Sequence, residues 1–213
     1  MAATLAQLRA RAQVIYDVSG SLVLSSSEWN DLVNDAYRAL WADVVSVNND
    51  FRNNVLPFTI TSGQTQALPA DFQDVRYVRR DPGLDTQMYL PKYPPKTGAG
   101  AFNRSYRLSG SNLLIEPIQR AAGSYDLTYV PQPPVLTADG DTLDLELDQF
   151  RDYLVYHAAI AAFAREESDI SQLAQLLGAV QGRVRRWAAG QRSADPDMVE
   201  DVRVQTTWQW TPP

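Results

Sequence analysis

The densest group of potential metal ligands in the sequence is an acidic run at residues 139–148. Its carboxylates belong to Asp139, Asp141, Asp144, Glu146 and Asp148. Carboxylate oxygens are ligands that calcium prefers, but a helix–loop–helix calcium site needs its glycine and its bidentate glutamate later in the loop than Gly140 and Glu146 stand. We therefore expect no metal here, but a solvent-facing edge, on which acids alternate with leucines, leading into a helix.

The sequence has few residues that could support nucleophilic or histidine-dependent catalysis. His157 is the only histidine, so a Ser–His–Asp triad or a histidine metal site would have to use it. It lies among alanines on the predicted inner face of a helix, which indicates a hydrogen-bonded core histidine instead. The sequence contains no cysteine and neither of the common glycine-rich phosphate loops. We therefore expect no catalytic residues, no metal and no cofactor.

An enzyme is nevertheless one alternative. Two of the 25 acidic residues could converge in a cleft and hydrolyse envelope sugars, as paired carboxylates do in glycosidases. No motif favours any particular pair, so the sequence gives this alternative no support.

The basic residues are concentrated near the predicted end of the last helix, at Arg183, Arg185, Arg186 and Arg192. A group of guanidinium ions can bind phosphate or an acidic partner. Cations at the end of a helix also offset the negative pole of its dipole. We favour the second interpretation, combined with surface ion pairing.

Trp208 and Trp210 stand in a final segment, residues 192–213, that has no periodicity. Their two-residue spacing places both rings on one face if the chain is extended. Indole rings are preferred anchors at interfaces, so we expect this segment to lie in a groove of another subunit or to add a strand to its sheet. A strand that returns to the chain's own sheet is the alternative. When extended, the residues after Gly190 reach on the order of 60–70 Å.

A second group of aromatic residues lies in or beside a proline-rich arm, residues 81–104. Its members are Tyr89, Tyr93, Phe102 and Tyr106. Connections of this length without a clear pattern are usually functional or disordered. A stacking platform for sugars is therefore another alternative, which would make the protein a carbohydrate- or host-binding module.

These side chains belong to an acidic chain of ordinary hydrophobicity. It has 213 residues, of which 45% are hydrophobic, enough for a core. Its net charge of −6 disfavours general binding to a phosphate backbone but suits a surface past which DNA slides. The first residues lack the regions of a signal peptide, and no apolar run is long enough to span a bilayer. We expect a soluble protein made inside the cell.

Two helices are predicted at the start of the chain, over residues 4–17 and 25–47, where apolar residues recur at helical spacing. Each begins with a capping box, in which a side chain and a backbone amide bond reciprocally. The two boxes are Thr4 with Gln7 and Ser25 with Glu28.

Two more helices are predicted near the other end. Asp148 is expected to cap the third, while Asp169 and Gln172 open the fourth, which Gly190 ends. The apolar stripe of the fourth helix is predicted to contain Leu173, Leu176, Val180, Val184 and Trp187.

Between the helix pairs the period changes to two, which predicts short strands. We place them near residues 56–60, 67–72, 75–79, 106–108, 113–116 and 124–130. Helices that flank a strand-rich insert must meet across it. The sequence therefore predicts an α+β fold, with a four-helix bundle, an inserted antiparallel β-sheet or open-barrel domain, and an extended C-terminal tail. The expected boundaries are 1–52 and 137–191 for the bundle, 53–136 for the insert and 192–213 for the tail.

The order of these parts resembles the head-to-tail adaptor (connector) proteins of tailed bacteriophages, of the tail tubular protein A or gatekeeper type. The resemblance covers roughly residues 4–190. The segments that carry it are residues 5–14, 27–41, 68–72 (Leu-Pro-Ala-Asp-Phe), 106–110, 114–117, 127–131 and the aromatic, then alanine-rich, helix 150–164.

The resemblance implies a structural virion protein at the head–tail junction, forming a dodecameric ring beneath the portal. DNA would pass through its lumen, the tail would grip the portal, and the strand domain would meet the tail nozzle or fibres. Stopper and neck proteins share parts of this pattern, so another level of the tail is an alternative. The predicted partner-binding residues are Trp208, Trp210, Arg183, Arg186, Arg192, Tyr89, Tyr93 and Phe102.

Overall fold

The computed structural model describes residues 2–17, 24–48, 50–61, 65–80, 88–90, 92, 104–118, 121–165 and 169–191. In these ranges the chain forms four α-helices and seven strands, the mixed α and β composition that the sequence predicts. The helices are α1 (Leu5–Asp17), α2 (Ser26–Val47), α3 (Arg151–Ala164) and α4 (Ser171–Gly190), and a short 3-10 turn (Asp148–Phe150) precedes α3. None of the described helices is both long enough and apolar enough to cross a membrane.

The first two helices begin where their capping residues stand. At α1 the Thr4 amide donates to Gln7 Oε1 (3.1 Å) and the Gln7 amide donates to Thr4 Oγ1 (3.3 Å). At α2 the Ser25 amide donates to Glu28 Oε2 (2.9 Å) and the Glu28 amide donates to Ser25 Oγ (3.3 Å). Each box satisfies amides that have no partner inside the helix. Both predicted capping boxes are confirmed.

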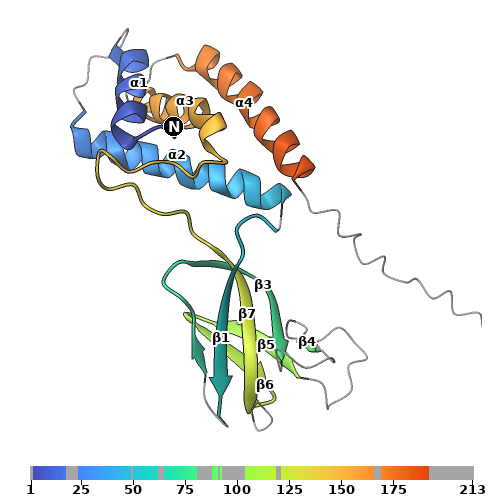
Figure 1. Ribbon diagram of the computed structural model, residues 1–213. Coiled ribbons are helices and arrows are strands. Elements are labelled where there is room, and N and C mark those ends of the chain that lie inside the picture. The colour runs from blue at the N-terminus through green and yellow to red at the C-terminus, as the bar shows by residue number, and fades with distance from the viewer. Residues whose placement is uncertain are drawn as a thin grey trace, which may run out of the picture.

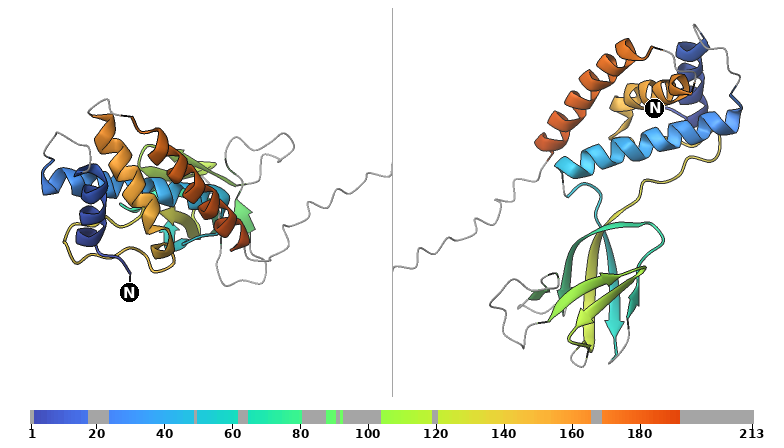
Figure 2. Two further views of the ribbon diagram at one scale, coloured as in Figure 1. Left: turned by 90° about the horizontal axis from the view of Figure 1, so that it is seen from above. Right: turned by 180° about the vertical axis from the view of Figure 1, so that it is seen from behind.

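The four helices share one apolar core, although all seven strands separate α2 from α3 in the sequence (Figure 1). Helix α2 contacts each of the other three helices. Viewed from above, α3 lies between α1 and α4 (Figure 2). Trp29 and Trp41 are buried in this core and Trp187 packs against it. Removal of this apolar surface from water is the main term that stabilises the helical body.

The strands form two antiparallel sheets in a lobe below the helices (Figure 1). The first sheet has the order β1 (Asn54–Ile60), β7 (Gly123–Pro131), β3 (Phe72–Arg80), β4 (Met88–Leu90). The second has the order β2 (Gln66–Ala67), β6 (Asn112–Glu116), β5 (Ser105–Ser109). Both sheets contribute to a second apolar core, with Ile60, Leu113 and Tyr125 among its members.

The helical body and the strand lobe are joined where the chain leaves α2 and where it returns after β7. Trp41 Nε1 donates a hydrogen bond of 3.0 Å to the Pro131 carbonyl at the end of β7. On the outgoing side, Arg52 has a left-handed backbone with φ of 53°. Its guanidinium forms ion pairs with Asp144 (3.0 Å) and Glu146 (3.3 Å) of the returning chain. These contacts tie both connecting segments to the helical body.

The predicted cap of α3 is wrong. Asp148 stands at the start of the 3-10 turn, and α3 follows Phe150 without a side-chain cap. The Asp148 carboxylate instead accepts the Ala3 amide at 2.7 Å, so it holds the start of the chain against this turn.

Three other local predictions also differ from the structure. The predicted strand 67–72 is interrupted: Ala67 ends β2, a turn follows Pro69, and Phe72 already begins β3. Leu176 is exposed, because the inward face of α4 passes through Leu177, which is half-buried, and the buried Val180 instead. The arm, residues 81–104, contains strand β4, which pairs with β3.

Candidate interaction surfaces

The carboxylates of the acidic run bind protein groups and do not gather around one point. Asp141 Oδ2 accepts the amides of Thr137 (2.7 Å) and Ala138 (2.8 Å). The Ala138 and then the Thr137 hydrogen bonds lower the pKa of Asp141, because they stabilise its ionised form. These contacts close a turn, and they leave Asp141 with a structural role.

Asp144 and Glu146 both pair with Arg52, so a cation of the protein already occupies the place between them. Asp144 accepts Arg52 and the Glu146 amide (3.0 Å). The predicted alternating edge is wrong, since a series of turns occupies these positions and Leu145 is 75% exposed while Leu143 and Leu147 are buried. Among the residues that the structure describes, no three side chains of metal-binding type form a group.

His157 is half-buried on α3. The predicted hydrogen bond of its ring is wrong for Nδ1. Its Nδ1 is buried and has no hydrogen-bond partner among the described residues. Its ring stacks on Tyr153, with centroids 6.0 Å apart and planes 13° apart. Burial lowers the pKa of His157, and the charges of Asp35 and Asp43 oppose this shift.

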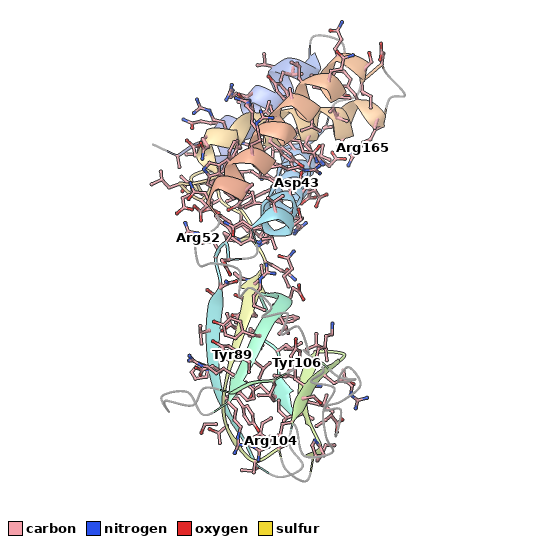
Figure 3. All side chains as sticks on the ribbon, turned by 90° about the vertical axis from the view of Figure 1, so that its right-hand side faces the viewer. Asp43, Arg52, Tyr89, Arg104, Tyr106 and Arg165 are labelled. Atoms are coloured by element: carbon pink, nitrogen blue, oxygen red, sulfur yellow. The ribbon has the colours of Figure 1, made fainter. Side chains whose placement is uncertain are left out.

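Asp43 joins three helices at the side of the helical body (Figure 3). Its Oδ2 accepts Tyr153 Oη of α3 (2.8 Å) and Gln181 Nε2 of α4 (2.8 Å). Its Oδ1 accepts Arg185 Nη2 of α4 at 3.1 Å. Burial, followed by the Asp43 hydrogen bond, raises the pKa of Tyr153. Asp43 therefore holds α4 against the rest of the body.

The arginines of the predicted basic group have different surroundings in the structure. Arg185 pairs with Asp43, whereas Arg183 and Arg186 are exposed and form no ion pair with any described residue. All three precede the last turn of α4, and the dipole effect fades within that turn. The dipole interpretation is therefore wrong for these positions. Arg183 and Arg186 remain candidates for contact with a partner, while Arg192 lies outside the described residues.

The predicted aromatic platform also divides. Tyr89 lies on β4 and is exposed, whereas Tyr106 is buried in the core of the strand lobe (Figure 3). Tyr93 and Phe102 lie outside the described residues, as do Trp208 and Trp210 of the tail. A platform that combines Tyr89 with Tyr106 is therefore excluded.

Tyr89 instead belongs to the outer face of the four-stranded sheet. Its ring meets Tyr77 of β3 edge to face, with centroids 5.2 Å apart. Val55 of β1 and Tyr77 are both register partners of Thr128 on β7, so they occupy the same row across the sheet. We call the surface formed by Val55, Tyr77, Arg79, Tyr89 and Asp126 the sheet face.

The sheet face combines exposed apolar side chains with a shielded ion pair. Val55, Tyr77 and Tyr89 are 58%, 40% and 56% exposed. Beside them Arg79 of β3 bonds Asp126 of β7, whose side chain is mostly buried, and this bond raises the pKa of Arg79. Exposed aromatic rings around a satisfied charge pair are typical of a protein-binding surface.

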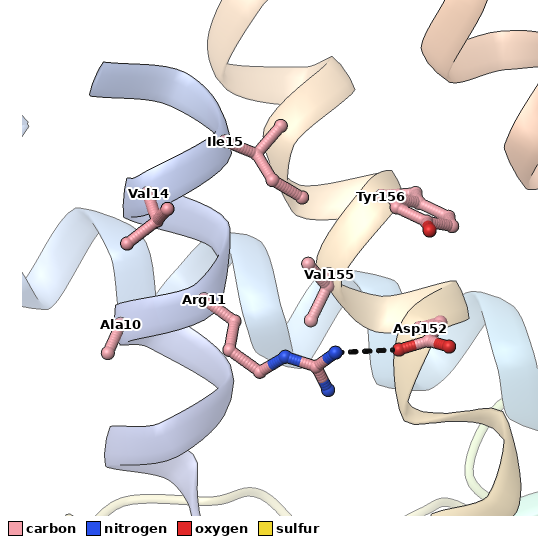
Figure 4. A pocket seen from close by; sticks show the side chains of 7 residues that line it. All are labelled: Ala10, Arg11, Val14, Ile15, Asp152, Val155 and Tyr156. Carbon is pink, nitrogen blue, oxygen red and sulfur yellow. Dashed lines mark ion pairs between the residues drawn. The ribbon is translucent and has the colours of Figure 1, made fainter. Parts of the chain in front are cut away.

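A groove lies between α1 and α3 (Figure 4). Its lining consists of Ala10, Arg11, Val14, Ile15, Asp152, Val155 and Tyr156, and its volume is about 350 Å³. Arg11 bonds Asp152 across it at 3.2 Å. Val14 stands on its rim and is 67% exposed. We call it the apolar groove.

A second hollow of about 480 Å³ adjoins the apolar groove and shares Ala10 and Arg11 with it. It is also lined by Ala3, Gln7 and Arg151. Arg151 is exposed and forms no ion pair with a described residue. We call it the basic hollow.

Sequence reasoning missed both the sheet face and the apolar groove. Val14 gave one signal, because it lies outside the stripe of Leu5, Leu8 and Ala12 that α1 buries. Tyr77 was predicted to lie in a strand, but which side of the sheet stays open depends on how the second sheet packs.

A family model described as SU10 adaptor protein matches residues 3–202, which include all four helices and both sheets. No curated protein matches the chain.

Proposed function

The chain belongs to the SU10 adaptor protein family and is a structural adaptor of a phage virion, and from this premise we propose that it joins the head to the tail. In this proposal it is of the tail tubular protein A or gatekeeper type and has no enzymatic activity. Copies form a ring, of twelve by resemblance, between the portal and the tail nozzle or fibres. The observation that carries the proposal is the family match over residues 3–202.

The division into two lobes supports a role between two partners. The helices form one core and the strands another, so each lobe has its own surface for a different neighbour. The contacts of Trp41 and Arg52 tie the two lobes together at the joint. An adaptor needs such a joint because it must transmit position from one partner to the other.

The charge of the chain supports a channel through which DNA passes without being held. At a net charge of −6 the chain gains little affinity from counterion release. We propose that DNA contacts the protein only during its passage through the lumen, without recognition of sequence.

The proposal is tested by the molar mass of the full chain, alone and mixed with a portal ring, by light scattering on a sizing column. We expect small species alone and a large stoichiometric complex with the portal. A protein that stays small beside a competent portal would overturn the proposal.

The tail is proposed to be the portal anchor. Deletion of residues 192–213 removes Trp208 and Trp210 and leaves every described helix and strand in place. We expect the truncated protein to fold, with an unchanged far-UV circular dichroism spectrum, and to lose attachment to the portal. Unchanged attachment would overturn the role of the tail alone.

A carbohydrate- or host-binding module is the second candidate function. The observation that favours it is the exposed pair Tyr77 and Tyr89, since aromatic faces can stack on apolar faces of sugars. Binding of the full chain to envelope glycans, lost in Tyr77→Ser and Tyr89→Ser, would support it.

A further inference from the structure

We infer that, in the free protein, the apolar groove and the basic hollow are the docking site for residues 195–210 of the same chain. We call these residues the C-terminal segment. This inference goes beyond the proposed function, because it concerns the protein before it meets any partner.

The apolar groove suits one large aromatic side chain. Ala10, Ile15 and Val155 offer apolar surface, and the volume of about 350 Å³ exceeds that of an indole ring. The Arg11 guanidinium lies at the groove, where a cation can interact with the face of an aromatic ring. Three of the five tryptophans, Trp29, Trp41 and Trp187, lie in or against the helical core, so Trp208 and Trp210 are the two indole rings left to fill the groove.

The charges of the two parts are complementary. Residues 195–201 contain Asp195, Asp197, Glu200 and Asp201 and no basic residue. The cation that the basic hollow leaves available is Arg151, which has no ion-pair partner among the described residues, whereas Arg11 already pairs with Asp152. Opposite charges across a docking surface steer association and fix its register.

The order of features along the segment matches their order on the surface. The acids at 195–201 come first in the chain, and the basic hollow lies toward Arg151, at the start of α3. The tryptophans come later, and the apolar groove extends toward Ile15 and Tyr156, farther along α1 and α3. A segment that runs along the surface in this direction places its acids at the basic hollow and its tryptophans at the apolar groove.

The end of α4 lies close enough for the same chain to reach the site. Trp187, in the last turn of α4, packs on Phe150 with ring centroids 5.3 Å apart, and Phe150 immediately precedes Arg151. Residues 192–207 can span on the order of 50 Å when extended, far more than one helix diameter. Because a tethered segment acts at an effective concentration of roughly millimolar, its own chain is favoured over a second copy.

The test uses cysteine pairs in the full chain, which has no cysteine of its own. The pair Val14→Cys with Gln209→Cys places one thiol on the rim of the apolar groove and one between the two tryptophans. The matched control pairs Val55→Cys with Gln209→Cys, since Val55 is exposed to a similar degree but lies on the sheet face. Oxidation is followed by non-reducing gel electrophoresis and intact mass, over a series of protein concentrations.

We expect an intramolecular disulfide to form at least about tenfold faster in the groove pair than in the control pair. Adding Trp208→Ala and Trp210→Ala should remove that difference. Equal rates in the two pairs would overturn the inference, because a freely moving segment meets both thiols. Disulfide-linked dimers whose rate rises with protein concentration would also overturn it, by making a second copy the occupant. The portal is absent from this test, so its outcome is separate from that of the proposed function.

Discussion

Asn34 and Leu136 are joined by two hydrogen bonds in the interior of the helical body. Asn34 Nδ2 donates to the Leu136 carbonyl at 2.9 Å, and Asn34 Oδ1 accepts the Leu136 amide at 2.8 Å. Both residues are buried. Leu136 follows the end of β7, so its backbone groups have no partner strand, and the Asn34 amide satisfies them instead. This pairing fixes where the returning segment meets α2.

Replacing Asn34 should destabilise the helical body, because two buried backbone groups of Leu136 lose their hydrogen-bond partners. In Asn34→Ala both backbone groups of Leu136 lose their partner, which costs about 2–4 kcal/mol of unfolding free energy. Urea unfolding followed by tryptophan fluorescence measures this, because Trp29, Trp41 and Trp187 all contact the helical core. The near-isosteric Asn34→Asp keeps an acceptor but loses the donor, so it should also destabilise the body. A loss below about 0.5 kcal/mol in both variants would contradict this role.

Arg52 should tolerate glycine better than valine. Its φ of 53° is strained for a residue with a branched β-carbon, and glycine adopts it freely. The ion pairs with Asp144 and Glu146 are largely exposed, so their loss costs less than about 1 kcal/mol. We expect Arg52→Gly to change stability little and Arg52→Val to lose about 1–2 kcal/mol in the same urea experiment. Equal effects of the two substitutions would show that the ion pairs dominate.

The hydrogen bonds of Asp43 to Tyr153 and Gln181 should stabilise the helical body more than its ion pair with Arg185 does. Asp43→Ala leaves both of those donors without their partner and should cost about 2–4 kcal/mol. Arg185→Ala removes only the exposed ion pair and should cost less than about 1 kcal/mol. Hydrogen exchange of the α4 amides, measured on both variants, should accelerate in Asp43→Ala alone. If hydrogen exchange accelerates to a similar degree in both variants, the ion pair of Arg185 is what holds α4 in place.

Much of the fold could be predicted because its signals are local. The boxes at Thr4 and Ser25 are contained within one helical turn, and the hairpin of β5 and β6 follows from the turn that contains Gly110, whose φ is 57°. The cap of α3 was wrong because the partner of Asp148 is Ala3, which is distant in sequence. No local pattern contains that pairing.

The candidate surfaces were less predictable because they depend on which elements meet. Tyr89 and Tyr106 look equivalent in sequence, yet one lies on the open side of a sheet and the other between two sheets. The apolar groove arises where α1 and α3 pack, so neither helix carries its pattern alone. Val14, which is exposed and lies outside the buried stripe of α1, was the one signal on that helix.

His157 should make the helical body less stable as the pH falls. Burial lowers its pKa below the ordinary value of 6.5, so the unfolded chain binds the proton more readily than the folded chain. The stability that comes from the neutral ring is therefore complete above 6.5 and is lost as the pH falls below this value toward the folded pKa. Unfolding free energies between about pH 7 and about pH 5 should decline more steeply in the natural chain than in His157→Gln. Parallel curves would assign the decline to the carboxylates instead.

The sheet face should bind a tail component through its two tyrosines. Tyr77 and Tyr89 are exposed, so Tyr77→Ser and Tyr89→Ser should lower stability by less than about 1 kcal/mol. At the centre of an interface, loss of an aromatic anchor costs about 2 kcal/mol or more, or roughly thirtyfold in affinity. Affinity is measured by titrating the full chain with the purified nozzle or fibre protein.

Val135→Ser is the matched control, because Val135 is exposed like the tyrosines but lies on the segment that returns to the helical body. Its affinity for the tail component should not change. If all three variants bind as the natural chain does, the sheet face is not the contact with the tail. If the tyrosine variants lose glycan binding and keep the tail component, Tyr77 and Tyr89 serve the host-binding alternative. Because the substitutions barely alter the fold, a selective loss of either ligand assigns this surface to that ligand.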